Sequence, residues 1–151
     1  MAKYSLNGAL ATAASAIAPV MNITGAATVR ARIYDIILGS VATPADNAAK
    51  FQLQRSTTAG TTPVTVVVAQ ALDPAEAAAV TTCNQGTYAT NPVLTAAAFL
   101  LQWSQNQRAT FRWVAAPGGE FVIPAVAANG IALVSPSGAA IVYDWMVHFE
   151  E

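Results

Sequence analysis

The feature that most constrains this chain is a strict alternation of apolar and polar side chains close to its C-terminus. Residues 143–150 read YDWMVHFE, and every second residue is a large apolar one. The apolar set is Tyr143, Trp145, Val147 and Phe149. A period of two puts successive side chains on opposite faces of an extended chain, whereas a helix needs a period near 3.6. The segment is therefore predicted to be a β-strand with one buried face.

The same alternation recurs upstream in the chain. It runs through 28–34 (TVRARIY), 50–55 (KFQLQR), 99–105 (FLLQWSQ) and 110–114 (TFRWV). The side chains expected on buried faces are Val29, Ala31, Ile33, Phe51, Leu53, Phe99, Leu101, Trp103, Phe111 and Trp113. Shorter candidate strands cover 65–69, 120–123 and 131–134, with a weak one at 11–18. Many short strands at close spacing are typical of a β-sandwich or barrel.

Turn residues separate these runs. The expected turns are Pro117-Gly118-Gly119, Asn129-Gly130 and Pro136-Ser137-Gly138, where glycine supplies a positive φ without steric cost. We interpret Gly118-Gly119 as the turn of a hairpin and not as a phosphate-binding loop. A strand and not a helix is expected to follow, and Glu120 would repel a phosphate.

One segment breaks the strand pattern. The stretch DPAEAAAV (73–80) offers Asp73 as an N-cap, Pro74 at the first helical position and Glu76 three residues after the cap. It predicts one short helix over 74–80. The chain shows no internal repeat or linker, so a single domain over 1–151 is expected.

The composition points to extensive burial of the surface. Hydrophobic residues make up 54% of the 151 residues and charged ones 10%, against about 25% charged in an average soluble domain. Such a chain either covers much of its surface with partners or sits in a membrane. The net charge of −1 and the scattered basic residues do not indicate a nucleic-acid partner.

A membrane segment would have to lie near the N-terminus, because no charged residue occurs between Lys3 and Arg30. That stretch is rich in alanine and is interrupted by polar residues, glycine and proline, so it is too polar for a spanning helix. MAK at the start is a short basic region of the kind that begins a signal peptide, but no leucine-rich run follows. We expect neither a signal peptide nor a membrane anchor.

The residues that usually carry chemistry are few. Cys83 is the single cysteine and His148 the single histidine, so no thiol cluster or histidine pair exists to hold a metal. His148 shares a strand face with Asp144 and Glu150. A Ser-His-Asp triad stays open on residue counts alone, although no serine lies in a G-x-S-x-G context. We expect no catalytic residue, metal or cofactor.

The C-terminal half carries a family resemblance. The stretches NQRATFRWVAAPGGEFVIPAVAANGIAL (106–133) and HFEE (148–151), with YDIILGSVATPADNAAKFQLQRSTTAGT (34–61), resemble small structural proteins of tailed bacteriophages. Members of that family decorate or cement the capsid. The resemblance spans most of 30–151 and is least distinctive over 71–92. It implies an antiparallel β-sandwich of jelly-roll type and brings no active site with it.

This resemblance implies a non-enzymatic virion protein on the capsid surface, assembled in the host cytoplasm. Its partners would be the major capsid protein and itself, as a homotrimer. An alternative is a carbohydrate- or receptor-binding module of a tail or fibre, with Trp103, Trp113 and Trp145 as a possible sugar-binding face. Each tryptophan lies on the apolar side of its strand, which favours core packing. A small β-sandwich hydrolase is a third hypothesis.

The N-terminal segment 1–20 is the candidate attachment arm. Its small side chains would let the main chain approach the exposed edge of a partner sheet closely. The residues expected to bind the partner are Lys3, Tyr4, Leu6, Leu10, Ile17 and Val20. The alternative is that this stretch forms the first strand of the protein's own sandwich.

Overall fold

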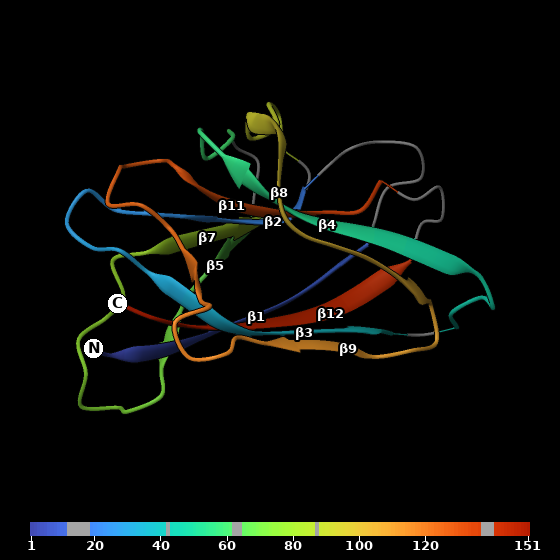
Figure 1. The fold of residues 1–151 in the computed structure, drawn as a ribbon, viewed down its shortest axis with the longest axis horizontal. Coiled ribbons are helices and arrows are strands. Elements are labelled where there is room, and N and C mark those ends of the chain that lie inside the picture. The colour runs from blue at the N-terminus through green and yellow to red at the C-terminus, as the bar shows by residue number, and fades with distance from the viewer. Residues whose placement is uncertain (12–18, 42, 62–64, 87, 137–140) are drawn as a thin grey trace.

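The computed structural model describes residues 1–11, 19–41, 43–61, 65–86, 88–136 and 141–151. They form two antiparallel sheets, called sheet A and sheet B, that pack face to face (Figure 1). Sheet A has the order β10 (Phe121–Val122), β3 (Arg32–Ser40), β12 (Val142–Glu150), β1 (Lys3–Ala11) and β6 (Gln70–Ala71), with β9 (Phe111–Val114) also paired to β3. Sheet B has the order β5 (Thr65–Val67), β7 (Thr82–Gln85), β2 (Pro19–Thr24), β11 (Gly130–Val134), β4 (Ala48–Ser56) and β8 (Leu94–Asn106).

The predicted antiparallel β-sandwich is confirmed, and its core follows from the alternation in the sequence. The inward residues of β12, which are Tyr143, Trp145, Val147 and Phe149, are at most 2% exposed. Facing strands of sheet B contribute residues such as Phe51 and Leu53 to the same hydrophobic core. Phe51 meets Tyr143 edge-on, with ring centroids 4.9 Å apart. The jelly-roll connectivity stays a prediction.

The N-terminal segment is a strand of the protein's own sheet and not a free arm. All nine residues of β1 pair with β12, from Lys3 opposite Glu150 to Ala11 opposite Val142. Tyr4 and Leu6 are 3% and 0% exposed, and the Tyr4 ring stacks on Phe149 at 5.2 Å. Burial of these apolar side chains between the sheets stabilises the segment in its own sandwich. Of the weak strand predicted at 11–18, Ala11 ends β1 and the rest lies outside the described residues.

The helix predicted over 74–80 is wrong, and no described residue is helical. Asp73 does cap the segment, because its Oδ1 accepts from Ala75 N at 2.9 Å, but the result is a turn. Beyond the turn, the amides of Val80 and Thr81 donate to the Glu151 carboxylate at 2.7 and 3.1 Å. A helix would need such amides for its own carbonyl groups. Within the described part of the chain, no helix has the length and apolar character needed to cross a membrane.

Phe99 does not face the core as predicted, because β8 is irregular at its centre. Leu53 of β4 lies opposite Leu101, but the next residue, Gln54, lies opposite Phe99, so Leu100 is an extra residue on β8. A bulge of this kind reverses the inward and outward order of the side chains beyond it. Phe99 is 46% exposed as a result.

The turn at Gly118-Gly119 is present, but it does not close a hairpin. Gly119 N donates to Ala116 O at 2.8 Å, and Gly118 has a φ of 79°. The strands on either side, β9 and β10, do not pair with each other. Both pair with β3, at different parts of its length. The turn at Asn129-Gly130 likewise carries the chain from sheet A to sheet B, and the predicted turn at 136–138 lies mostly outside the described residues. The segment 28–34 becomes a strand only from Arg32.

Candidate functional site

The outer face of sheet A holds the main grouping of polar side chains. Strands β1, β12 and β3 lie side by side there, and their registers align outward residues in three rows. The first row is Ser5, His148 and Asp35. The second is Asn7, Met146 and Ile37. The third is Ala9, Asp144 and Gly39. Strand β9 extends the second row with Arg112.

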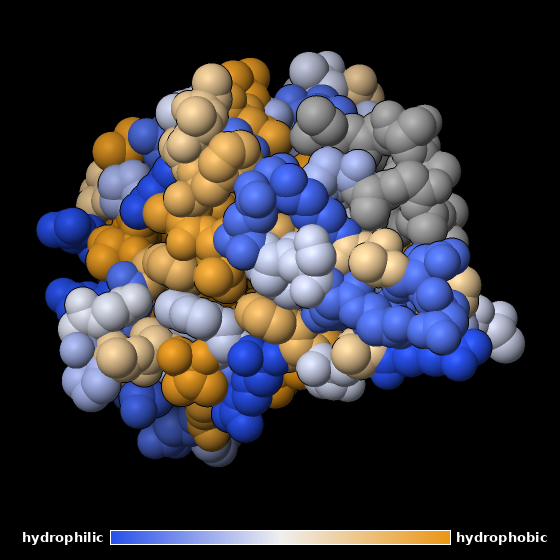
Figure 2. Space-filling view, turned by 45° about the vertical axis from the view of Figure 1, so that its right-hand side comes forward, coloured by the Kyte–Doolittle hydropathy of each residue, from blue (hydrophilic) through white to orange (hydrophobic). Residues whose placement is uncertain are grey.

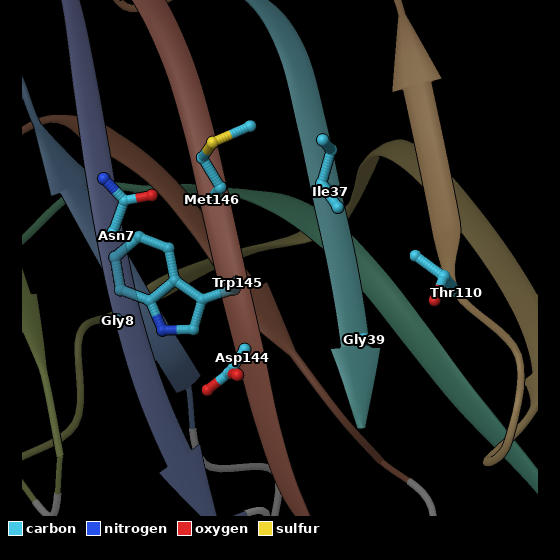
Figure 3. Close-up of a pocket in the computed structure, with 8 residues that line it drawn as sticks. All are labelled: Asn7, Gly8, Ile37, Gly39, Thr110, Asp144, Trp145 and Met146. Carbon is cyan, nitrogen blue, oxygen red and sulfur yellow. The ribbon is translucent and has the colours of Figure 1, made fainter. Parts of the chain in front are cut away.

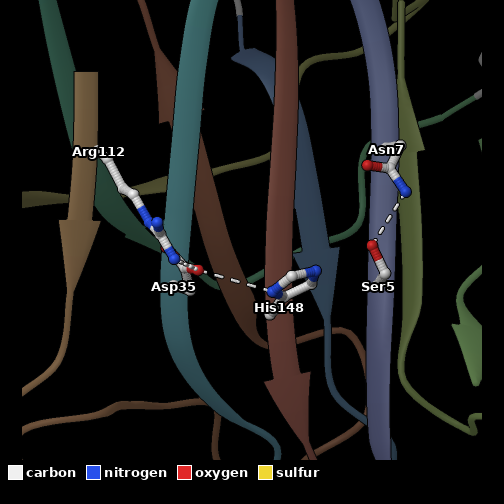
Figure 4. Close-up of polar contacts among 5 residues, drawn as sticks. All are labelled: Ser5, Asn7, Asp35, Arg112 and His148. Carbon is white, nitrogen blue, oxygen red and sulfur yellow. Dashed lines mark hydrogen bonds and ion pairs between the residues drawn. The ribbon is translucent and has the colours of Figure 1, made fainter. Parts of the chain in front are cut away.

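An ion pair between Asp35 and Arg112 ties β3 to β9. Arg112 Nε and Nη2 donate to the two carboxylate oxygens of Asp35 at 3.1 and 2.8 Å (Figure 4). The Asp35 side chain is 5% exposed and that of Arg112 is 60% exposed. These hydrogen bonds, together with the negative charge of Asp35, raise the pKa of the Arg112 guanidinium. The pair anchors the short strand β9 at the edge of the sheet.

His148 lies on the other side of Asp35, because of an irregularity in β3. His148 is opposite Asp35, whereas Phe149 is opposite Ile33, so Tyr34 is an extra residue on β3. His148 Nδ1 is 3.6 Å from Asp35 Oδ2. The Tyr34 ring lies 6.0 Å from the imidazole between centroids. The bulge thus places an aromatic residue and a carboxylate next to the single histidine.

Ser5, His148 and Asp35 have the residue types of a catalytic triad, but not its hydrogen bonds. Ser5 Oγ accepts from Asn7 Nδ2 at 2.9 Å, and among the described residues no hydrogen bond joins Ser5 to His148. The distance of 3.6 Å from His148 to Asp35 exceeds that of a hydrogen bond. A triad needs both links to activate the serine. The geometry therefore gives the hydrolase hypothesis no support.

A hollow of about 510 Å³ lies beside this cluster on the same face (Figure 3). It is lined by Asn7, Gly8, Ile37, Gly39, Thr110, Asp144, Trp145 and Met146. The third row creates the open space, because Ala9 is small and Gly39 has no side chain. A methyl group at Gly39 would meet nothing closer than Thr110 at 3.6 Å. Sequence reasoning missed the hollow, since it depends on the alignment of strands far apart in the chain.

Trp145 borders the hollow from the core side. The residue is 2% exposed, and its Nε1 donates to Gln85 Oε1 at 3.1 Å across the sandwich. The indole ring packs where a side chain at Gly8 would be, so a larger residue on β1 would overlap it. The other two tryptophans stack on phenylalanines near the core, Trp103 on Phe111 and Trp113 on Phe121, each at 4.2 Å. Core packing, the favoured interpretation of the tryptophans, is confirmed.

The predicted partner-binding residues are not gathered on one surface. Tyr4, Leu6 and Val20 are at most 3% exposed and belong to the core. Lys3 is exposed, with Nζ 5.8 Å from the centre of the Tyr34 ring. Ile17 and the Leu10 side chain lie outside the described residues. Burial rules out Tyr4, Leu6 and Val20 as contacts for a partner.

The remaining titratable groups do not form a second site. Cys83 is fully buried, and burial raises the pKa of its thiol. Such a thiol is a poor nucleophile at neutral pH. Within the described residues, no group of three or more His, Cys, Asp or Glu side chains lies close enough to hold a metal ion.

Hydrophobic residues also reach the surface, and a broad hydrophobic patch is visible in Figure 2. On the edge strand β5, Val66 is 64% exposed, and Val68 just beyond it is 67% exposed. With Ala78 and Ala79 they line a groove of about 160 Å³. We call Val66, Val68, Ala78 and Ala79 the valine edge.

Comparison of the chain with protein-family models, curated proteins and solved structures finds no match.

Proposed function

We propose that this protein is a non-enzymatic structural protein of a virion. It decorates and cements the capsid of a tailed bacteriophage by binding the major capsid protein. The resemblance carried by 34–61, 106–133 and 148–151 supports this proposal. The low charge supports it independently, because charged residues are depleted where one protein covers another.

The valine edge is the observation that carries the proposal. An edge strand presents unpaired main-chain groups, and proteins usually protect such edges with charged residues or proline. Between Arg55 and Asp73 the chain has no charged residue, and within β5 it has no proline. Two valines more than 60% exposed stand beside an apolar groove at this edge. A partner that covers the edge would remove this surface from water and pair with its free main-chain groups.

The proposal includes the assembly. A homotrimer on the capsid surface, formed in the host cytoplasm, fits the threefold positions of an icosahedral shell. The jelly-roll connectivity belongs to the same proposal. In such an assembly the valine edge faces the capsid protein.

A carbohydrate- or receptor-binding module of a tail or fibre is the second candidate. The hollow on the outer face of sheet A is the observation that favours it. Outward tryptophans would supply a stacking platform for a sugar ring, but Trp145 is 2% exposed and donates its N–H within the protein. The capsid proposal is therefore preferred.

The copy number of the chain in purified virions tests the proposed function. A cementing protein is expected at a fixed ratio to the major capsid protein. Shells stripped of it should melt at lower temperature, and adding the purified chain should restore the melting temperature. A trace copy number, or shells that melt alike with and without the chain, would contradict the proposal.

A further inference from the structure

The hollow on the outer face of sheet A has a chemical character that singles out one kind of occupant. We propose that it binds a lysine or arginine side chain of a protein partner. The aliphatic part of that side chain lies against Met146 and Ile37, and its cationic end contacts Asp144. In the context of the proposed function the partner is the major capsid protein, and that assignment rests on the proposed function.

The charged group that lines the hollow is the carboxylate of Asp144, which only accepts hydrogen bonds. Among the described residues, the side chain of Asp144 has no hydrogen bond or ion pair, so both carboxylate oxygens are available. Asn7 donates one Nδ2 hydrogen to Ser5 Oγ, which leaves its Oδ1 and its second Nδ2 hydrogen for a ligand. Thr110 adds a hydroxyl at the rim. The carboxylate favours a cationic ligand that is rich in donors, and lysine and arginine side chains carry donors without acceptors.

The size and walls of the hollow suit a long side chain with a polar end. The third row spans three strands about 4.8 Å apart, so the open floor is roughly 10 Å across. Met146 and Ile37 are half-buried apolar residues in the next row. Lysine and arginine place their methylene groups along such surfaces while the charged end contacts a polar group. Asp144 lies on the floor beside these walls, in the third row (Figure 3).

The electrostatic surroundings favour a cation. A positive group on this face is Arg112, which lies opposite Ile37, and its guanidinium is directed to Asp35. Because that charge is compensated within the protein, Asp144 remains the uncompensated charge of the hollow. A charge-assisted hydrogen bond to a carboxylate is about twice as strong as a neutral one.

A neutral sugar fits the hollow less well. Sugar sites combine acceptors with donors and commonly use an exposed aromatic ring as a platform. Here the Trp145 ring is turned inward toward Gln85 and is 2% exposed, so it offers no such platform. Sugar binding is therefore treated as one outcome of the test.

The first experiment is a titration of the full-length protein, followed by nuclear magnetic resonance of its backbone amides. N-acetyl-arginine amide is the probe, and N-acetyl-citrulline amide is its uncharged counterpart of similar shape. The arginine probe should shift the amides of Asn7, Gly39, Asp144 and Met146 with a common saturation curve, and the citrulline probe should not. Asp144→Asn should weaken binding about tenfold.

Glu76→Gln is the matched control for that variant. It removes one negative charge from an exposed residue in the turn after Asp73, away from the hollow, and should bind the probe like the unmodified protein. Absence of shifts around the hollow, or equal binding by Asp144→Asn, would overturn the inference. Shifts produced by methyl glucoside and not by the arginine probe would assign the hollow to a sugar instead.

The second experiment separates the hollow from the proposed function. Shells lacking the chain are mixed with the unmodified protein, with Asp144→Lys or with Glu76→Gln. Loss of shell binding in Asp144→Lys alone, by tenfold or more, places the basic side chain on the capsid protein. Equal binding of all three would overturn that assignment and leave the proposed function intact. Binding of the arginine probe without any binding to shells would uphold the hollow and contradict the proposed function.

Discussion

The Asp35 carboxylate accepts two hydrogen bonds from the Arg112 guanidinium across the boundary between β3 and β9. Asp35 is almost completely buried, whereas more than half of the Arg112 side chain is exposed. A carboxylate in such a position is costly unless it is paired and hydrogen-bonded. Arg112 thus stabilises a charge that the bulge in β3 has placed beneath the surface.

Replacing Arg112 with glutamine should lower the melting temperature by a few degrees. The substitution leaves the buried Asp35 carboxylate without its bidentate partner and weakens the attachment of β9. His148→Ala should lower the melting temperature less, because the imidazole is 3.6 Å away and makes no hydrogen bond to Asp35. Differential scanning calorimetry measures both, with Arg30→Gln, an exposed arginine, as control. If His148→Ala lowered the melting temperature more than Arg112→Gln, Arg112 would not be the main partner of Asp35.

Because β1 belongs to the sandwich, a substitution at Leu6 should strongly destabilise the protein. The side chain is fully buried between the sheets, so Leu6→Ala should destabilise the protein by about 2–5 kcal/mol through lost burial and a cavity. Lys3→Ala, on the outer face of the same strand, should change stability by less than about 1 kcal/mol. Urea unfolding gives both values. A Leu6→Ala variant that is as stable as the unmodified protein would mean that β1 is detachable and would revive the attachment arm.

The sequence predicts local structure well and the relation between distant strands poorly. The alternation in 143–150 identifies a central strand, because one face of that strand is buried along its whole length and the other face points outward. The helix wrongly predicted over 74–80 shows the limit, since the amides of Val80, at its end, and of Thr81 donate to Glu151, about seventy residues away. The candidate site likewise depends on the pairing of strands that are far apart in the sequence. Nothing local in the sequence places Asp35 beside Arg112, or Gly39 beside Asp144.

Substitutions in the valine edge should abolish binding to shells without changing the stability of the protein. Lysine on an edge strand opposes pairing with another chain, so Val66→Lys combined with Val68→Lys should abolish binding to shells. Both side chains are exposed, and the free energy of unfolding should change by less than about 1 kcal/mol. Thr95→Lys, on the strand at the opposite edge of sheet B, is the matched control and should bind normally. Normal binding by the double variant would show that the partner lies elsewhere.

The buried thiol of Cys83 predicts a loss of stability at alkaline pH. Burial raises the pKa of the thiol in the folded protein well above its ordinary value of 9.0, so the folded thiol stays protonated where the unfolded one ionises. Stability is therefore fully present below pH 9 and falls as pH rises above it, by at most about 1.4 kcal/mol per pH unit for one proton. For Cys83→Ala, the free energy of unfolding measured in urea should fall less steeply between pH 9 and 10. Equal slopes would show that other groups cause the alkaline loss.

Replacement by alanine should destabilise the protein at Gly8 but not at Gly39. A methyl group at Gly8 would overlap Gln85 Oε1 and the six-membered ring of Trp145, whereas one at Gly39 meets only Thr110 at ordinary contact distance. Gly8→Ala should cost about 1–3 kcal/mol, because the indole must leave its packed position. Gly39→Ala should stay within about 1 kcal/mol, since neither a clash nor a positive φ opposes it. Thermal unfolding measures both variants, and tryptophan fluorescence reports whether Trp145 moves. A tolerated Gly8→Ala with unchanged fluorescence would mean that the indole does not lie over β1.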